Sequence, residues 1–295
     1  MPRNQIIGNL ALSGYEDIFR SDISTHSGES IVEIPIEELF TPEQHPFQVI
    51  DDAEMLSLVA SIRQHGVREP GLVRPRAEGG YELLCGNRRR RACEIAEIKT
   101  MPVIVRSLDD DCAAIVMIES NLHQREKILP SERAWAYRIM MEALNHNGVK
   151  GDSHSYETMT ERTGVKKSQL FKIVRLTELI TTLIDKVDAK QLAFNPAVEL
   201  SYLSVMEQTA VAIAMDNNQI KPSLSQAIRL KKMKQDGKLT TEAINDMLSE
   251  EKKPPKGEPT GDARYRRFFP PDYSPKQIDA VIVELLTDWK ARAAE

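Results

Sequence analysis

Hydrophobic positions follow two spacings along the chain, and the change between them divides it into parts. Between residues 31 and 125, short apolar runs with the alternation of strands lie between stripes at three- and four-residue intervals, which are typical of helices. This mixture predicts a small mixed α/β domain. The predicted strands are Ile31–Ile36, Leu72–Arg74, Tyr81–Leu84 and Val103–Val105, and the predicted helices are Ala53–Gln64, Arg88–Ile98 and one beginning at Ala113.

Glycines mark the ends of these elements. Gly66 follows the first predicted helix, where a left-handed residue commonly ends a helix. Gly79 and Gly80 separate two predicted strands, where a tight turn needs positive φ.

Beyond residue 125 the strand pattern stops and helical stripes continue. We expect an all-helical domain over residues 126–235, and then a linker and a C-terminal helix over residues 236–295, with the Pro-rich segment Glu250–Pro259 as the linker. Residues 1–30 have weak periodicity and predict a mobile N-terminal tail. The predicted fold class is therefore helix-rich α+β, with a small mixed α/β domain followed by an all-α domain.

Composition narrows the function classes. The net charge is −5 and the pI about 5.8, so any nucleic-acid surface must be local. No apolar run approaches the roughly 20 residues of a membrane span, and we expect no membrane association. The three cysteines lack a CxxC spacing, which indicates a reducing cytoplasm. The common phosphate-binding loops and the HExxH zinc motif are absent.

Four consecutive arginines follow a strand and a glycine, in the segment from Leu83 to Ala92. Gly86 allows a ligand to approach the backbone, and we expect Asn87 to cap a new helix whose N-terminus attracts anions. Guanidinium groups bind phosphate oxygens in a bidentate manner. The pattern predicts a site for a polyphosphate or a nucleic-acid backbone. The alternative is a solvated basic helix face.

The segment Gly86–Ala92 resembles the GERRxRA signature of ParB-type chromosome and plasmid partition proteins, with Asn87 where the family has Glu. The resemblance extends over about residues 31–235 and implies a ParB-like nucleotide-binding domain over residues 31–125. In that family the signature holds the triphosphate of CTP. Pro46–Gln48 resembles a second nucleotide-contacting segment, although Val49-Ile50 replaces the family's Pro-Arg. The nucleotide-binding residues that the resemblance implies are Gln48, Gly86, Asn87, Arg88, Arg89, Arg91 and Asn121.

A third segment, Ile118–Glu126, resembles the part of the family that binds magnesium and supports hydrolysis. This chain has extra residues between Glu119 and Arg125. The resemblance implies Asn121 as a ligand of Mg²⁺, which prefers hard oxygen atoms, and Glu119 as the catalytic carboxylate of a slow CTP hydrolase. The alternative is that both are ordinary polar groups at a helix end.

Residues Tyr156–Arg175 fit a helix-turn-helix, with Gly164 in the turn and Met159, Val165, Leu170 and Ile173 buried between the helices. The stretch from residue 162 to 175 holds five basic side chains and no acidic one, in a chain that is acidic overall. Lysines neutralise phosphates, and Ser and Gln can bind base edges. The alternative is a helical hairpin with a solvated basic face. The predicted DNA-binding residues are Lys166, Lys167, Ser168, Gln169, Lys172 and Arg175.

Together with the basic helix-turn-helix, the resemblance implies a cytoplasmic, nucleoid-associated protein that recognises a centromere-like site on double-stranded DNA. It would act in the segregation of a chromosome, plasmid or mobile element and close as a CTP-dependent clamp. We expect a homodimer, and a ParA-type ATPase as a partner of the N-terminal tail. The C-terminal helix could dimerise through Ile278, Ile282, Leu285 and Trp289 or equally pack on its own chain.

Two other function classes stay open. One is a sequence-specific transcriptional regulator on the same scaffold without nucleotide switching, which the departures at Val49, Ile50 and Asn87 favour slightly. The other is a nuclease or redox enzyme on a related fold, which we do not expect, because the sequence has no cluster of acids or histidines at metal-ligand spacing.

Overall fold

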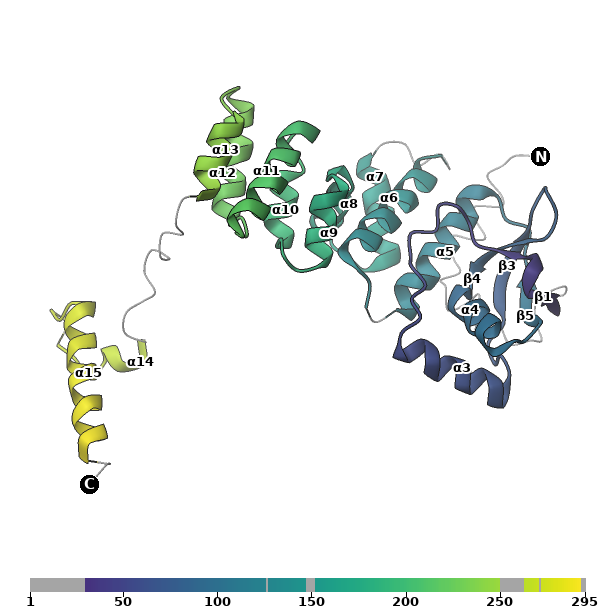
Figure 1. The fold of residues 1–295 in the computed structure, drawn as a ribbon, viewed down its shortest axis with the longest axis horizontal. Coiled ribbons are helices and arrows are strands. Elements are labelled where there is room, and N and C mark those ends of the chain that lie inside the picture. The colour runs from purple at the N-terminus through teal and green to yellow at the C-terminus, as the bar shows by residue number, and fades with distance from the viewer. Residues whose placement is uncertain (1–29, 126, 147–151, 250–262, 271, 293–295) are drawn as a thin grey trace. The chain divides into compact units, whose positions relative to one another are not determined.

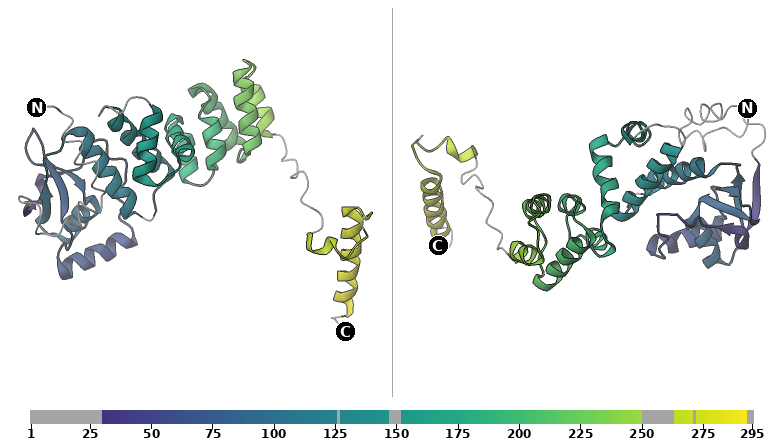
Figure 2. Two further views of the ribbon diagram at one scale, coloured as in Figure 1. Left: turned by 180° about the vertical axis from the view of Figure 1, so that it is seen from behind. Right: turned by 90° about the horizontal axis from the view of Figure 1, so that it is seen from above.

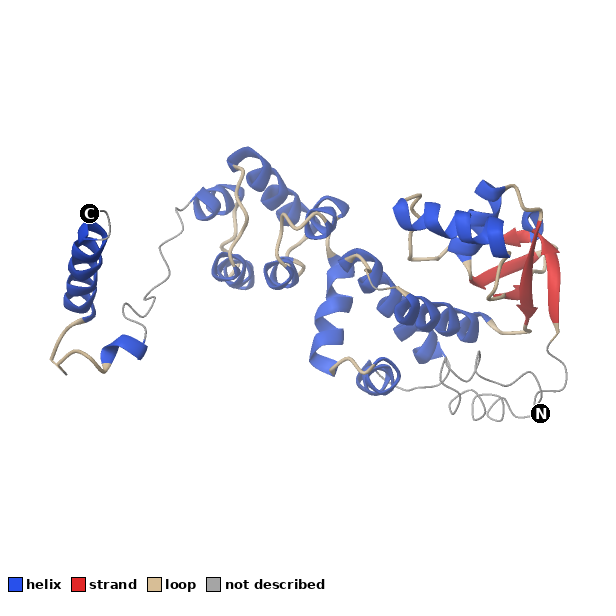
Figure 3. Ribbon diagram, turned by 90° about the horizontal axis from the view of Figure 1, so that it is seen from below, coloured by secondary structure: helices blue, strands red, loops and turns tan. Residues whose placement is uncertain are grey.

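A computed structural model describes residues 30–125, 127–146, 152–249, 263–270 and 272–292 of this chain (Figure 1). Contacts between Cα atoms divide the chain into a larger unit that ends at Leu248 and a smaller unit that begins at Ser249. The larger unit holds one mixed sheet followed by helices, so the predicted helix-rich α+β fold class is confirmed (Figure 3). Among the described helices, none has the length and apolar character that crossing a bilayer requires.

The sheet has five strands in the order β1-β5-β3-β4-β2. β1 pairs antiparallel with β5 and β3 antiparallel with β4, whereas β5–β3 and β4–β2 are parallel. Side chains from all five strands form a buried cluster that includes Ile34, Leu39, Val73, Leu83 and Met101. The strands are β1 (Ile31–Pro35), β2 (Leu39–Phe40), β3 (Gly71–Pro75), β4 (Tyr81–Cys85) and β5 (Thr100–Val105), and a short 3₁₀ helix, η1 (Ile36–Glu38), precedes β2.

Two helices, α3 (Ala53–His65) and α4 (Asn87–Ala96), pack against each other. The carboxylate of Asp52 caps α3 by accepting a hydrogen bond from the backbone N–H of Met55 at 2.8 Å. Gly66 ends α3 with φ of 71°, which confirms its expected role. Gly80 has a φ of 71° and packs against η1. A Cβ at this position would lie only 2.8 Å from the carbonyl oxygen of Glu38.

The helix α5 (Asp110–Gln124) joins the sheet to the helical part of the larger unit (Figure 2). Buried residues of α5, including Ile115 and Ile118, belong to the same apolar cluster as Ala134, Tyr137 and Met140 of α6. The remaining helices of this unit are α6 (Pro130–His146), α7 (Asp152–Thr163), α8 (Lys167–Arg175), α9 (Thr181–Asp188), α10 (Phe194–Leu200), α11 (Val205–Asn218), α12 (Leu224–Gln235) and α13 (Thr241–Ser249), with a 3₁₀ helix, η2 (Leu176–Glu178), after α8.

The end of the helical part lies further along the chain than residue 235. In α13, Ile244, Met247 and Leu248 are buried, and Gln226 of α12 donates a side-chain hydrogen bond to the Met247 carbonyl at 2.9 Å. Residues 241–249 therefore pack with the helical body, although the sequence places them after its end. The domain boundary at residue 125 stays a prediction, because the buried side chains of α5 and α6 form one apolar cluster that extends across it.

The smaller unit contains α14 (Ala263–Arg266) and α15 (Pro275–Arg292). On α15, Ile278 is buried, but Leu285, Leu286 and Trp289 are 58–67% exposed. Helical spacing gathers these side chains on one stripe, most of which the described residues leave uncovered, so dimerisation through it stays a prediction. The predicted N-terminal tail and its ATPase partner lie outside the described residues.

Candidate functional site

The first candidate site lies where β4 runs into α4. Gly86 is the N-cap of α4, with φ of 113°, and Asn87 is the first helical residue. The prediction that Asn87 caps this helix is therefore wrong, and its side chain makes no cap hydrogen bond. Any larger residue at Gly86 would be strained by the positive φ, and its Cβ would lie 3.0 Å from Cε of Met101. The free N–H groups at a helix N-terminus favour an anion, although Met101, Gly71 and Arg89 cover the side of Gly86 on which a Cβ would lie.

Asn87 points inward and holds the segment that precedes α3. Its Oδ1 accepts a hydrogen bond from the Thr41 hydroxyl at 2.8 Å, and its Nδ2 lies 3.1 Å from Nε2 of His45. Burial lowers the pKa of His45, which favours the neutral ring; Nδ1–H can then donate to the Phe47 carbonyl at 2.8 Å while Nε2 accepts from Asn87. The amide thus fastens residues 41–47 to the start of α4.

Arg89 is the most enclosed of the four arginines. Its side chain is 13% exposed, and Nη1 donates to the carbonyl oxygens of Glu69 and Pro70 at 2.6 and 2.8 Å. Both carbonyls belong to the segment that enters β3. Arg89 therefore links that segment to the first turn of α4, and its guanidinium lies in a fixed position beside Gly86.

Arg88, Arg90 and Arg91 are each paired with nearby acids. Arg88 lies 3.4 Å from Oδ1 of Asp52, and Arg91 forms a 2.6 Å ion pair with Asp51. Arg90 pairs with Glu94 at 3.0 Å, and Glu94 also contacts Arg91. The Asp51 carboxylate raises the pKa of Arg91, and Arg91 in turn lowers the pKa of Asp51. In the absence of a ligand, these acids balance the positive charge around the helix N-terminus.

Gln48 is held by its backbone. Its N–H donates to Oε1 of Glu132 at 2.7 Å, and its carbonyl accepts from Nη1 of Arg125 at 2.9 Å. Glu132 is buried and also accepts from the backbone N–H of Leu129 at 3.1 Å. The Arg125 guanidinium lies over the Phe47 ring at 5.3 Å from its centroid and 3.8 Å from the Glu132 carboxylate. The Gln48 side chain is left free to face outward, and the residue is exposed.

Glu119 and Asn121 occupy different surroundings. The Glu119 side chain is 8% exposed, and Oε1 accepts from Nη1 of Arg162 in α7 at 2.8 Å. Asn121 donates from Nδ2 to the Met117 carbonyl at 2.8 Å, so its amide oxygen is the atom that could face a metal. No group of three His, Cys, Asp or Glu side chains in the described residues is placed to hold a metal ion. With Glu119 bound to Arg162, these residues do not form a magnesium site by themselves.

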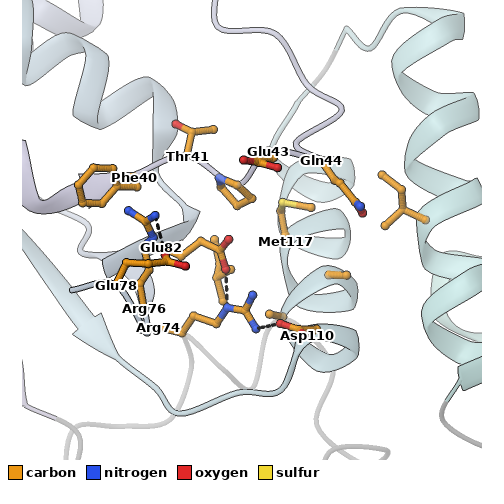
Figure 4. Close-up of a pocket in the computed structure, with 15 residues that line it drawn as sticks. Phe40, Thr41, Glu43, Gln44, Arg74, Arg76, Glu78, Glu82, Asp110 and Met117 are labelled. Atoms are coloured by element: carbon orange, nitrogen blue, oxygen red, sulfur yellow. Dashed lines mark hydrogen bonds and ion pairs between the residues drawn. The ribbon is translucent and has the colours of Figure 1, made fainter. Parts of the chain in front are cut away.

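A pocket of about 680 Å³ lies beside the first candidate site (Figure 4). Thr41 is common to both, since it lines the pocket and also contacts Asn87 and Arg90. Inside the pocket Arg74 is paired with Glu82 and with Asp110, the latter at 2.7 Å. None of the predicted nucleotide-binding residues lines it, so it is a separate feature of the surface.

The second candidate site is the exposed face of α8. Gly164 has φ of 69° in the turn that connects α7 to α8, and Leu170, Ile173 and Val174 are buried beneath α8. Tyr156 and Met159 of α7 are buried as well. Between Lys166 and Arg175 the exposed residues are Lys166, Lys167, Ser168, Gln169, Phe171 and Lys172. The exposed face of α8 is therefore polar and basic, and its Lys167 forms a 3.2 Å ion pair with the exposed Glu157 of α7.

Arg175 differs from the other predicted DNA-binding residues. Its guanidinium donates to the hydroxyl and the carbonyl of Ser201, at 3.1 and 2.9 Å, and lies over the Tyr202 ring at 4.3 Å from the centroid. Lys231 lies 3.7 Å from the centroid of the same ring. Arg175 thus packs within the helical body, and a contact between Arg175 and DNA stays a prediction.

Comparison with known proteins shows which sequences this chain resembles. The family model of the ParB N-terminal domain matches residues 20–122. A nucleoid occlusion protein of Listeria monocytogenes is 29% identical over 72% of this chain and 70% of its own length. A protein of Deinococcus radiodurans named "Probable chromosome 1-partitioning protein ParB" is 37% identical over 42% of each chain. The chain therefore contains a ParB N-terminal domain.

Two crystal structures of C-terminally truncated ParB from Caulobacter crescentus also align with this chain. One is a complex with the centromeric parS site, with 22% identity, a TM-score of 0.43 and coverage of 75% of this chain and 100% of that chain. The other is a complex with CTP-γ-S, with 28% identity, a TM-score of 0.31 and coverage of 63% and 99%. Because both TM-scores are below 0.5, the family assignment rests on the sequence matches.

Three residues that hold the candidate sites in place are not among the predicted site residues. Arg125 and Glu132 hold Gln48, and Arg162 holds Glu119. Arg125 lies within Ile118–Glu126, the segment that resembles the magnesium-binding part of the family, so its position is a usable signal. Glu132 has no such signal, and the basic character of Arg162 does not by itself point to Glu119, which lies 43 residues earlier in the chain.

Proposed function

We propose that this chain is a ParB-type, DNA-binding partition protein that recognises a centromere-like site with α7–α8 and binds CTP at the N-terminus of α4. The observation that carries the proposal is the exposed face of α8, where Lys167, Ser168, Gln169 and Lys172 face solvent over a buried apolar side. A helix of this kind fits the major groove of B-DNA, with its N-terminal residues toward the base edges.

Charge supports the DNA half of the proposal. The whole chain is acidic, and double-stranded DNA would be repelled by an even distribution of that charge. α8 carries basic side chains and no acidic one, so its own net charge is positive. The lysines on this helix would neutralise phosphates, while Ser168 and Gln169 can exchange hydrogen bonds with bases.

Residues around α4 support the nucleotide half. Gly86 is the N-cap of α4, Arg88 and Arg89 lie on the first turn, and Arg125 contributes a further guanidinium near Gln48. A triphosphate would replace the acids that now pair with Arg88 and Arg91. Magnesium bound to that triphosphate would draw one oxygen ligand from Asn121. Two copies of the chain that close around DNA when CTP binds would form the predicted clamp, because a ligand that prefers the closed state shifts the equilibrium toward it.

A sequence-specific regulator without nucleotide switching is the second candidate function. The inward position of Asn87 favours it, because the family's carboxylate is replaced by an amide that is already bound to Thr41 and His45. The ion pairs of Arg88 with Asp52 and of Arg91 with Asp51 would also stabilise the site without a ligand.

Replacing both Lys167 and Lys172 with glutamine should test the DNA half. We expect the double variant to bind a duplex selected by the wild-type protein from a random pool more weakly, with the slope of log K against log salt reduced by about 2, because two phosphate contacts are lost. Affinity measured by fluorescence anisotropy at several salt concentrations gives the slope. The matched control replaces Lys99 and Lys238, which are exposed and lie outside α7–α8. An equal reduction in the control would contradict the proposed interface.

The variant Arg89→Ala should test the nucleotide half. Loss of one charge-assisted contact predicts CTP affinity reduced at least about tenfold, with binding to the selected duplex unchanged. Filter binding of radiolabelled CTP, with the duplex present, measures it. Arg63→Ala is the control, because Arg63 also donates to a backbone carbonyl, that of Ile95 at 3.1 Å, and lies on α3. If the wild-type protein binds no CTP even with the duplex, the second candidate function replaces the first.

A further inference from the structure

An aromatic side chain interrupts the polar face of α8. Phe171 is 48% exposed, whereas its apolar neighbours Leu170, Ile173 and Val174 are buried on the other side of the helix. Phe171 lies four residues after Lys167 and three after Ser168, so the three side chains share one face. The buried side already supplies the contacts with the helical body. The exposed part of the ring therefore stays in contact with water, and covering this apolar surface with a ligand would be favourable.

The position of the ring is fixed before any ligand arrives. The Phe171 centroid lies 6.1 Å from that of Tyr156 in α7, with the two rings inclined at 56°, and Tyr156 is buried. One part of Phe171 thus rests on Tyr156, and the remainder points away from the helical pair. A side chain that is already held loses little conformational freedom on binding, which favours a specific contact.

The major groove offers one apolar group on the base edges, the C5-methyl group of thymine. We propose that Phe171 is a specificity-determining residue that contacts a thymine methyl when α8 lies in the major groove. This inference rests on the proposed DNA-binding function. Lys167 and Lys172 would hold the phosphates on either side, and Phe171 would favour thymine at one or two positions of the site without forming a hydrogen bond.

Uracil is the direct probe, because it pairs like thymine and lacks the methyl group. The full-length protein first selects its site from a pool of random duplexes. Each thymine of that site is then replaced singly with deoxyuridine, and dissociation constants are measured for the wild-type protein and for Phe171→Ala. We expect deoxyuridine at one or two positions to weaken wild-type binding about fourfold, which corresponds to one buried carbon group. Phe171→Ala should bind the unmodified site about fourfold more weakly and show no further loss at those positions.

Two further variants separate this contact from an effect on folding. Phe171→Leu keeps an apolar side chain against Tyr156 and should retain part of the thymine preference. Trp135→Ala removes an exposed aromatic residue of α6, 49% exposed, and should leave every uracil effect unchanged. Thermal unfolding of each variant shows whether the chain is intact.

The outcomes are distinct. If the pool yields a site but no deoxyuridine changes wild-type affinity, the inference is wrong and the proposed function stands. The inference is also wrong if Phe171→Ala remains as sensitive to deoxyuridine as the wild-type protein, because Phe171 would then act through the fold or bind something other than DNA. If the pool yields no site, the proposed function and the inference both fail.

Discussion

Replacing Glu132 with alanine should lower the free energy of unfolding by about 3 kcal/mol. The carboxylate is buried and accepts hydrogen bonds from the backbone of Gln48 and Leu129, and each donor left without a partner costs on the order of 1–3 kcal/mol. Arg125 would also lose the nearby carboxylate. Urea denaturation of the full chain, followed by circular dichroism, measures the change.

Two control variants test whether the loss of stability comes from the buried contacts of Glu132. Glu132→Gln keeps a side-chain oxygen for one of the two donors and should lose only about 1 kcal/mol. Glu142→Ala removes an acid of the same helix that is 51% exposed and pairs with Arg138, and surface pairs of this kind contribute about 0–1 kcal/mol. Equal losses for Glu132→Ala and Glu142→Ala would show that Glu132 does not hold the Gln48 segment.

The variant Arg162→Ala should lower the free energy of unfolding by about 3 kcal/mol, because it leaves Glu119 as a buried carboxylate without its cation. The ion pair joins α5 to α7, so the loss should be accompanied by faster hydrogen exchange in both helices. Denaturant unfolding at pH 7 and exchange measured by mass spectrometry are the readouts.

The double variant Glu119→Gln/Arg162→Ala removes the unpaired charge, and we expect it to recover at least about 1 kcal/mol relative to Arg162→Ala. The single variant Glu119→Gln shows how much the neutral amide costs alone. If the double variant is as unstable as the sum of the two single variants, the two side chains are independent and the ion pair has no stabilising role.

Local sequence rules predict the elements well because their causes are local. The stripe of Met55, Val59 and Ile62 and the stop at Gly66 indicate α3, and both are present. The turn at Gly79-Gly80 requires two positive φ values, and both residues have them. Each of these features depends on residues only a few positions apart.

Features that depend on distant partners could not be predicted in this way. Asn87 is typical of a helix cap, but Thr41 and His45 draw its side chain inward. Glu119 matches a catalytic position in the family segment, yet its partner Arg162 comes from another helix. The spacing of Leu285 and Trp289 predicts one apolar face on α15, and nothing in that spacing says what covers it.

The shared core of α5 and α6 limits how this protein can be divided for study. Ile115, Met117 and Ile118 of α5 are buried, and they belong to the same cluster as Tyr137 and Met140. A recombinant fragment ending at residue 125 would leave that side of α5 in water, an uncovered apolar surface of the kind that drives self-association. Soluble, monomeric material is better sought by cutting after α13, where the larger unit ends.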